Sequence, residues 1–272
     1  MTEYAPLSTA SPTDDSATLE FRNVSLQYMT SNYPMKVIDQ VSFKVNKSEF
    51  ISIVGPSGCG KTSLLRMVSG LNPVKSGQVY FRGEPVTKPL QNVGIAFQNP
   101  VLLPWRNTIQ NVLLPLEIVP SHKRRLSVER SYYINSAQEL LSTVGLKDFQ
   151  GHYPWQLSGG MKQRASLCRA LIHQPEILLL DEPFAALDAF TREEMWELLQ
   201  RLWTRTQCTS MLVTHDLREA IFLSDKVYVM GPRPSKILYT LEVNLPRPRT
   251  LDICFTDNFH RMYSELRRYI QR

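Results

Sequence analysis

Alternating apolar and polar residues predict strands in the first hundred positions. The stretches LEFRNVSLQY (19–28) and QVSFKVNKSEFISIVG (40–55) alternate as half-buried strands do. GQVYFRGEPV (77–86) predicts a strand pair, and NVGIAFQ (92–98) predicts a buried strand that ends on a polar residue. Three later apolar runs predict fully buried strands, which are typical of parallel sheets. These runs lie in EILLLDEP (176–183), TSMLVTH (209–215) and DKVYVMG (225–231).

Helical spacing appears between these strands. TSLLRMVSG (62–70) predicts a short helix that ends at Gly70. TREEMWELLQRLW (191–203) predicts a longer helix, with Thr191 and Glu194 as its capping box. The apolar stripe of that helix consists of Met195, Leu198, Leu199, Leu202 and Trp203. Strands that alternate with helices predict an α/β fold on a mainly parallel sheet.

From Asn99 to Gln156 the spacing of apolar residues changes from strand-like to helical. TIQNVLLPLEI (108–118) and VERSYYINSAQELLSTVGL (128–146) carry the helical signal. We therefore expect a helical subdomain at about residues 99–165, inserted into an α/β domain that spans 19–235. The polar segment 1–18 is expected to be a disordered leader, and 236–272 a basic C-terminal extension.

Composition limits the class of protein. Of the 272 residues 43% are hydrophobic, which is enough for a sizeable core and argues against wholesale disorder. The longest apolar runs, such as ILLL at 177–180, are far shorter than the roughly 20 residues of a membrane-spanning helix. The chain is therefore not expected to cross a membrane by itself. Its four cysteines form no C-x-x-C pair, which disfavours a zinc or disulfide framework and indicates a reducing compartment.

Positive charge gathers toward the end of the chain. The net charge is +6, and residues 233–272 carry eight Lys and Arg against four Asp and Glu. A second basic cluster, HKRR, occupies 122–125. Basic patches can bind nucleic acid or an anionic membrane surface, or form a solvated face. Because no aromatic pattern of an RNA-binding module accompanies them, the solvated face is the favoured interpretation, and no nucleic-acid partner is expected.

A glycine-rich loop carries the first chemical signal. GPSGCGKTS (55–63) fits G-x-x-x-x-G-K-[ST], with a predicted strand before it and a predicted helix after it. Its glycines allow successive N–H groups to surround phosphate oxygens, and the helix N-terminus adds positive potential. Lys61 can reach the outer phosphates, and Thr62 can bind Mg²⁺. The expected nucleotide-binding residues are Gly55, Pro56, Ser57, Gly58, Cys59, Gly60, Lys61, Thr62 and Ser63.

A pair of carboxylates completes this site. In ILLLDE, four apolar residues place Asp181 at the end of a buried strand, where it can hold Mg²⁺. Glu182 follows and can act as a general base on a water near the γ-phosphate, an effect worth on the order of 10²–10⁴-fold in rate. The loop and the carboxylates together predict a P-loop NTPase, a fold that serves many unrelated functions.

With six motifs in this order, the chain resembles the ATP-binding subunit of an ATP-binding cassette (ABC) transporter. The motifs are GPSGCGKTS, Gln98 in AFQ, LSGGMKQR, ILLLDEP, AALD ending in Asp188, and TH ending in His215. The resemblance covers about residues 19–235. It implies an ABC ATPase cassette with a RecA-like core, an antiparallel β subdomain and an inserted helical subdomain, and ATP and Mg²⁺ as ligands.

The resemblance also gives a role to LSGGMKQR (157–164). By itself this stretch would be a loop in which Ser158 caps a helix, whose N-terminus offers an anion roughly 0.3–1 kcal/mol. In the family, two cassettes pair head to tail. Ser158, Gly159 and Gly160 of one subunit would then contact the γ-phosphate held by the other subunit's phosphate loop. Met161 departs from the Gln that the family usually has.

Four more roles follow from the resemblance. Gln98 would sense Mg²⁺ or the attacking water, and His215 would contact the γ-phosphate. Asp188 would shape the contact between the two cassettes. Tyr28 would stack on adenine, with Tyr33 as the alternative because the segment between them looks expanded.

The resemblance points further to importers. A lone cassette needs membrane partners, and THDLREA and LSGGMKQR look importer-like. LLPWRNTIQNVLLPLE (102–117) and the ending GPRPSKI…VNLPRPRTLD resemble the nitrate/sulfonate/taurine class, with thiamine-precursor importers of similar build. The implied partners are a second cassette, identical or paralogous, two transmembrane permease subunits and a periplasmic or extracellular solute-binding protein. The implied location is peripheral, on the cytoplasmic face of the inner membrane. The alternatives are a soluble ABC ATPase acting on nucleic acid or ribosomes, and an exporter cassette.

Overall fold

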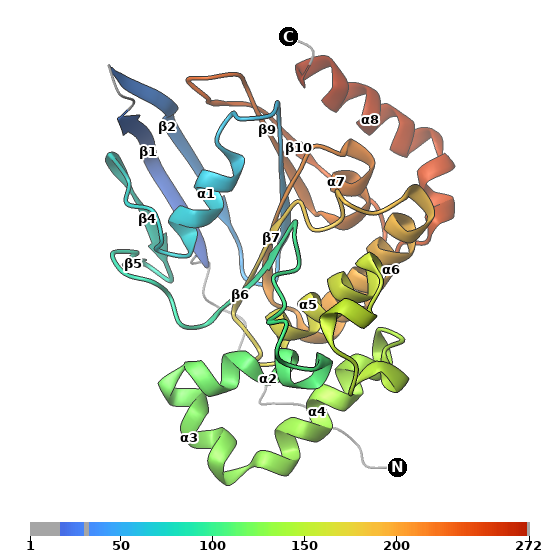
Figure 1. The fold of residues 1–272 in the computed structure, drawn as a ribbon. Helices are drawn as coiled ribbons and strands as arrows, with labels where there is room; N and C mark the ends of the chain where they lie inside the picture. Colours follow the sequence, from blue (N-terminus) through green and yellow to red (C-terminus); the bar gives the residue numbers. More distant parts are fainter. Residues whose placement is uncertain (1–16, 30–32, 271–272) are drawn as a thin grey trace, which may run out of the picture.

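The computed structural model describes residues 17–29 and 33–270, which form two sheets and an all-helical group (Figure 1). The smaller sheet is antiparallel, in the order β2-β1-β4-β5. Its strands are β1 (Leu19–Met29), β2 (Pro34–Val45), β4 (Ser76–Phe81) and β5 (Glu84–Pro85). The larger sheet has the order β10-β9-β3-β8-β7-β6. Its strands are β3 (Phe50–Val54), β6 (Val93–Phe97), β7 (Ile177–Asp181), β8 (Thr209–Thr214), β9 (Lys226–Met230) and β10 (Ile237–Glu242).

Every neighbouring pair in the larger sheet is parallel except β9 with β10. The mainly parallel sheet expected from the buried apolar runs is therefore confirmed. Helices fill the crossovers, as parallel strands require. The helices are α1 (Lys61–Val68), α2 (Thr108–Ile118), α3 (Pro120–Val128), α4 (Arg130–Thr143), α5 (Gly159–Leu171), α6 (Ala189–Thr206), α7 (Leu217–Leu223) and α8 (Asp257–Ile270).

Helices α2, α3 and α4 gather at one end of the molecule, between β6 and α5 in sequence (Figure 1). Asn107 begins α2 with the capping box Asn107–Gln110, in which each side chain binds the other residue's backbone N–H. The two sheets and this helical group together form the arrangement that the resemblance to an ABC ATPase cassette implies.

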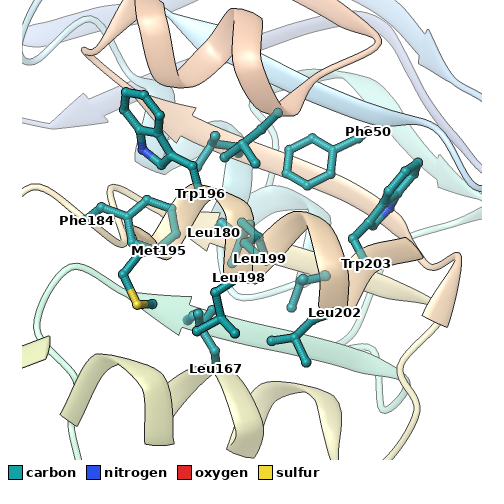
Figure 2. Packing of buried hydrophobic residues seen from close by; sticks show 14 of the residues in the cluster. Phe50, Leu167, Leu180, Phe184, Met195, Trp196, Leu198, Leu199, Leu202 and Trp203 are labelled. Atoms are coloured by element: carbon teal, nitrogen blue, oxygen red, sulfur yellow. The ribbon is translucent and has the colours of Figure 1, made fainter. Parts of the chain in front are cut away.

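The larger sheet lies between two apolar layers, because alternate residues of each strand face opposite sides. Phe50 and Val54 of β3 belong to the cluster that α5, α6, α7 and α8 cover. Ile51 and Ile53 belong to the cluster shared with α1 and the antiparallel sheet. Figure 2 shows the first layer, where Trp196, Leu199 and Trp203 of α6 pack together with Phe50. The apolar stripe predicted for 191–203 is thus buried as expected.

The start of α6 differs from the sequence-based expectation. The helix begins at Ala189, and Asp188 is its N-cap, accepting the backbone N–H of Thr191 at 3.0 Å. The predicted capping box at Thr191 and Glu194 is therefore wrong. The hydroxyl of Thr191 donates to Asp188 instead, at 2.7 Å, and Glu194 pairs with Arg164. Asp188 competes better for the cap because its carboxylate accepts both donors at once.

Residues 236–270 pack onto the sheet and its covering helices rather than standing apart. β10 joins the sheet beside β9, and α8 buries Phe259, Met262 and Leu266. Arg249 is only 2% exposed, and its Nη1 donates to the carbonyl oxygens of Ile221, Phe222 and Ser224 at the end of α7. Burial lowers the pKa of this guanidinium to about 9. Arg247 pairs with Asp225, at 2.9 Å. Two of the basic residues of this segment are therefore committed to internal contacts, which weakens the interpretation of a basic surface.

The expected leader, 1–18, lies outside the described residues except for its last two positions. Across the ranges that the structure does describe, no helix is long and apolar enough to cross a membrane.

Candidate nucleotide-binding site

Four parallel strands end at one edge of the larger sheet, and the predicted chemical residues follow those ends. Phe97 pairs with Asp181, Asp181 with Val213, and Val54 with Thr214. Because these strands run parallel, the residues after them leave the sheet at the same edge, the usual place for a ligand in an open α/β sheet. The residues that follow the strands are Gly55, Gln98, Glu182 and His215.

The phosphate loop connects β3 to α1. Gly60 is the residue before the helix, at φ 108°, and Gly58 also has positive φ, at 75°. A Cβ on Gly60 would lie 3.0 Å from both Val37 and Ile38, so the turn needs glycine for space as well as for conformation. Lys61 is 5% exposed, and its Nζ donates to the carbonyl oxygens of Gly55 at 2.9 Å and Pro56 at 3.0 Å.

This lysine is evidence that the loop fits a polyphosphate. Nearly buried ammonium groups are usually paired with an anion. Lys61 instead donates hydrogen bonds to two carbonyl oxygens of its own loop. An incoming phosphate would supply the charged acceptor that these carbonyls replace.

Thr62 and Asp181 form the second part of the site. The Thr62 hydroxyl donates to Asp181 Oδ1 at 2.8 Å. Burial raises the pKa of Asp181, and the hydrogen bond from Thr62 opposes that shift. A hydroxyl and a carboxylate side by side are hard oxygen ligands of the kind that Mg²⁺ binds, usually together with water and substrate phosphates. The sequence prediction that these two residues act together is supported by their contact.

Glu182 and His215 form the third part. The Glu182 carboxylate lies 3.0 Å from His215 Nδ1, and the backbone N–H of Glu182 donates to Val213 at 2.8 Å. Glu182 adopts φ 46°, a left-handed conformation that costs a non-glycine residue on the order of 1–3 kcal/mol. The hydrogen bonds on both sides hold this conformation, which turns the carboxylate toward the phosphate loop.

A cavity of about 260 Å³ is lined by the phosphate loop, Thr62 and Glu182, whereas Asp181 and His215 do not line it and are linked to it through Thr62 and Glu182. Tyr28 lines it together with the loop, and its hydroxyl lies 3.1 Å from Ser63 Oγ and accepts from Asn72 Nδ2 at 3.1 Å. Tyr33 does not line this cavity. Of the two tyrosines considered for adenine, the geometry therefore favours Tyr28. The full lining is Tyr28, Met35, Val37, Ser57, Gly58, Gly60, Lys61, Thr62, Ser63, Glu182 and Arg233.

The LSGG residues lie elsewhere in the chain. Ser158 is the N-cap of α5, and its Oγ accepts the backbone N–H of Met161 at 3.2 Å. A Cβ on Gly159 would meet no atom within 4 Å, whereas one on Gly160 would lie 3.1 Å from Thr191 Cγ2. Neither these residues nor Gln98 and Asp188 line the cavity. Within one chain, the phosphate loop and the LSGG stretch are thus separate surfaces.

Asp188 lies close to that second surface. Its carboxylate accepts both the N–H and the hydroxyl of Thr191, and these hydrogen bonds lower its pKa. Thr191 Cγ2 also lies next to the point where a Cβ on Gly160 would be. Thr191 therefore keeps Asp188 and the LSGG stretch next to each other.

Sequence reasoning missed three residues of the cavity. Met35 and Val37 belong to β2, and Arg233 belongs to the turn between β9 and β10. The strand predicted at 40–55 begins after Met35 and Val37, so the first part of β2 was not predicted, and neither was its position next to the phosphate loop. The stretch GPRPSKI contributes to the resemblance to the nitrate/sulfonate/taurine class. No sequence pattern, however, places Arg233 next to the phosphate loop, 175 positions earlier.

Fold and site define a P-loop ATPase, and comparison with known proteins identifies the family. A family model described as ABC transporter matches residues 38–185, more than half of the chain. The bicarbonate transport ATP-binding protein CmpD of Synechocystis sp. is 40% identical, covering 96% of this chain and 91% of that protein. The aliphatic sulfonates import ATP-binding protein SsuB of Bacillus cereus is 37% identical, covering 86% and 89%. The taurine import ATP-binding protein TauB of Escherichia coli O157:H7 is 37% identical, covering 82% and 86%.

Solved structures agree. The ATP-binding cassette MJ0796, in a dimeric post-hydrolysis state bound to ADP and Pi, superimposes with a TM-score of 0.70 at 28% identity, covering 84% of this chain and all of that one. A second dimeric structure of MJ0796 gives 0.71 at the same identity. The chain belongs to the ABC transporter family. It is an ATP-binding and ATP-hydrolysing subunit, and SsuB and TauB among its relatives are import proteins, so the resemblance found in the sequence is confirmed.

Proposed function

We propose that this chain powers the uptake of a small anion through separate membrane subunits, by hydrolysing ATP in the cavity at the carboxyl edge of the larger sheet. The observation that carries the proposal is the convergence there of Lys61, the Thr62–Asp181 pair and the Glu182–His215 pair. Similarity to bicarbonate, sulfonate and taurine proteins supports the substrate class, since all three substrates are small and carry an anionic oxygen group.

The phosphate loop binds the substrate ATP. Lys61 exchanges its carbonyl partners for phosphate oxygens, and the backbone N–H groups at the start of α1 add neutral donors. Tyr28 offers its ring to adenine. Thr62 and Asp181 would hold Mg²⁺, and Gln98, which follows the end of β6, would be a further ligand. The ion supplies charge neutralisation on the phosphates when bound.

Glu182 is the general base. Its carboxylate accepts a proton from the attacking water, and the left-handed backbone at this residue aims it into the cavity. The His215 ring contacts that carboxylate through Nδ1, which fixes the orientation of the ring, and its Nε2 edge faces the γ-phosphate, to which Nε2 can donate only when it carries a proton.

A second cassette completes the site. Ser158, Gly159 and Gly160 lie on their own surface beside Asp188, where they face a partner rather than the cavity of the same chain. The dimeric state of MJ0796 supports the pairing of two cassettes, and the separation of the LSGG stretch from the cavity of its own chain favours a head-to-tail arrangement. Each phosphate loop then meets the LSGG stretch of the other copy, and ATP lies between them.

The remaining partners follow from the importer type. Two permease subunits carry the solute across the membrane, a solute-binding protein outside the membrane delivers it, and this chain lies on the cytoplasmic face. In this arrangement the transported anion never touches the cassette.

Uptake in intact cells tests the proposal. Cells carrying either this chain or its Glu182→Gln variant are given labelled bicarbonate, nitrate, taurine, alkanesulfonates and thiamine pyrimidine precursors. We expect one of the first four to lose uptake in the variant, which would fix direction and substrate together. Unchanged uptake of all four anions would contradict the substrate class, and failure of membrane subunits to co-purify would contradict the transport role.

A further inference from the structure

Arg233 places a second cation in the nucleotide cavity. It belongs to the turn between β9 and β10, far in sequence from the phosphate loop, yet it lines the same cavity as Lys61 and Tyr28. Arg233 and Lys61 are the cationic side chains in the lining, and Glu182 is the anionic one. None of the six motifs named above includes Arg233, and the GPRPSKI stretch that contains it was given no role.

The turn that carries Arg233 is anchored to the site on both sides. Ser235 donates its hydroxyl to the carbonyl oxygen of Cys59 in the phosphate loop. The backbone N–H of Ser235 donates to Val37, and that of Asp39 donates to Ser235, both at 2.9 Å. Arg233 is therefore held at the cavity by its neighbours and does not depend on a long, free side chain to reach it.

The guanidinium lies across the middle of the phosphate loop. Its Nε donates to the carbonyl oxygen of Gly58, and its Nη1 lies 3.6 Å from Met35 Sδ. A Cβ on Gly58 would lie only 2.5 Å from Nη2, so the glycine makes room for this group. Met35 is paired with Tyr28 in the antiparallel sheet. Arg233 thus spans the distance between the phosphate end and the base end of the cavity.

The charge of Arg233 lacks an anionic partner. No carboxylate within the described ranges forms an ion pair with it, although its neighbour Lys236 pairs with Asp39 at 3.3 Å. A guanidinium with spare N–H donors beside a phosphate loop is suited to a planar, charge-assisted contact with phosphate oxygens.

We propose that Arg233 is a nucleotide-binding residue, which donates from its terminal nitrogens to the phosphate chain of the ATP held by the same subunit. Its role rests on the nucleotide site proposed above. The Nε–Gly58 hydrogen bond fixes the guanidinium plane, and Nη1 and Nη2, which lie beside Met35 and Gly58 in the lining, are the donors offered to the ligand. Arg233 therefore strengthens nucleotide affinity, whereas the chemistry of hydrolysis stays with Glu182.

The test compares Arg233→Gln, Arg233→Lys and the matched control Lys236→Gln, which removes a charge from the same turn outside the cavity. Binding of Mg²⁺·AMP-PNP is measured by calorimetry at two salt concentrations, and ATPase KM and kcat are measured on the full chain. We expect Arg233→Gln to raise the dissociation constant and KM about tenfold, the size of one charge-assisted contact at an exposed position. The effect should shrink at high salt, with kcat within about twofold. Arg233→Lys should recover part of the affinity, and the control should match the wild type.

Three results would overturn the proposal. Wild-type affinity in Arg233→Gln means that the guanidinium does not touch the nucleotide. A lowered kcat with unchanged KM means that Arg233 only supports Gly58. A loss of affinity that salt does not alter and that lysine does not recover means that the guanidinium stacks on the base. If the wild-type chain itself binds no Mg²⁺·AMP-PNP, the proposed site fails as a whole. Thermal unfolding without nucleotide checks that each variant is folded.

Discussion

Gly94 is the point where the strand that leads to Gln98 meets the helix that begins with the LSGG stretch. It lies in β6 against the last turn of α5. A Cβ at this position would overlap the carbonyl oxygen of Ala170, and it would lie 2.9 Å from Pro175 Cγ and 3.1 Å from the carbonyl carbon of Ala170. We predict that Gly94→Ala destabilises the chain and lowers its ATPase rate.

The size of the effect follows from what must move. The atoms in the way are mostly backbone, so relief requires β6 and α5 to separate by on the order of 1 Å, and overpacking of this kind costs about 1–3 kcal/mol. The reduced flexibility of the unfolded chain returns at most about 0.4–1 kcal/mol. The net loss should be about 1–2 kcal/mol, because the two terms partly cancel. The same separation shifts Gln98 and Ser158 away from the positions proposed for them.

Urea denaturation followed by circular dichroism measures the loss. Gly151→Ala is the matched control, because a Cβ there would meet no atom within 4 Å. We expect the control to stay within about 0.5 kcal/mol of the wild type. If Gly94→Ala proves as stable and as active as Gly151→Ala, the close approach of β6 and α5 does not constrain the site and the reasoning is refuted.

Three further predictions concern a buried acid, a buried base and the partner surface. Burial raises the pKa of Glu219 from its ordinary value of 4.5 to about 8, so the folded chain keeps a proton that the unfolded chain releases. The free energy of unfolding should therefore fall as pH rises from about 4.5 to 8. Thermal unfolding of Glu219→Gln should lack this decline, and parallel pH curves for the wild type and the variant would contradict the prediction. Arg249→Met should lower the free energy of unfolding by about 2–5 kcal/mol, since it removes the donor that buried carbonyls bind, whereas Arg261→Met, at an exposed position of α8, should change it little. Ser158→Arg should abolish ATP-dependent dimerisation in size-exclusion chromatography, and Ser127→Arg should not; dimers in both would disprove the head-to-tail pairing.

Much of the fold could be read from the sequence because apolar periodicity reports burial directly. The runs at 177–180 and 209–214 are buried on both faces, and the pattern at 195–203 is buried on one. Local chemistry at helix starts was harder to predict. Asp188 and Thr191 both lie near the start of α6 and both have side chains that can cap a helix. Only the structure shows that Asp188 is the N-cap.

The site was predictable where its residues lie in contiguous motifs. The Thr62–Asp181 and Glu182–His215 contacts each join two motifs that the sequence had already assigned to the same ligand. Arg233 and Met35 were not predictable, because their approach to the loop depends on how the β9–β10 turn lies against β2. Side chains that act through such long-range packing leave no local pattern.

The most direct test of the account is the rate of ATP hydrolysis by Glu182→Gln, measured alongside its ATP affinity. If Glu182 is the base, the rate should fall at least about 100-fold, because the amide cannot accept the proton, while ATP binding stays near that of the wild type. The variant should then accumulate as an ATP-bound dimer. Hydrolysis at the native rate would contradict the central claim that this carboxylate, held by His215 beside the phosphate loop, drives the reaction.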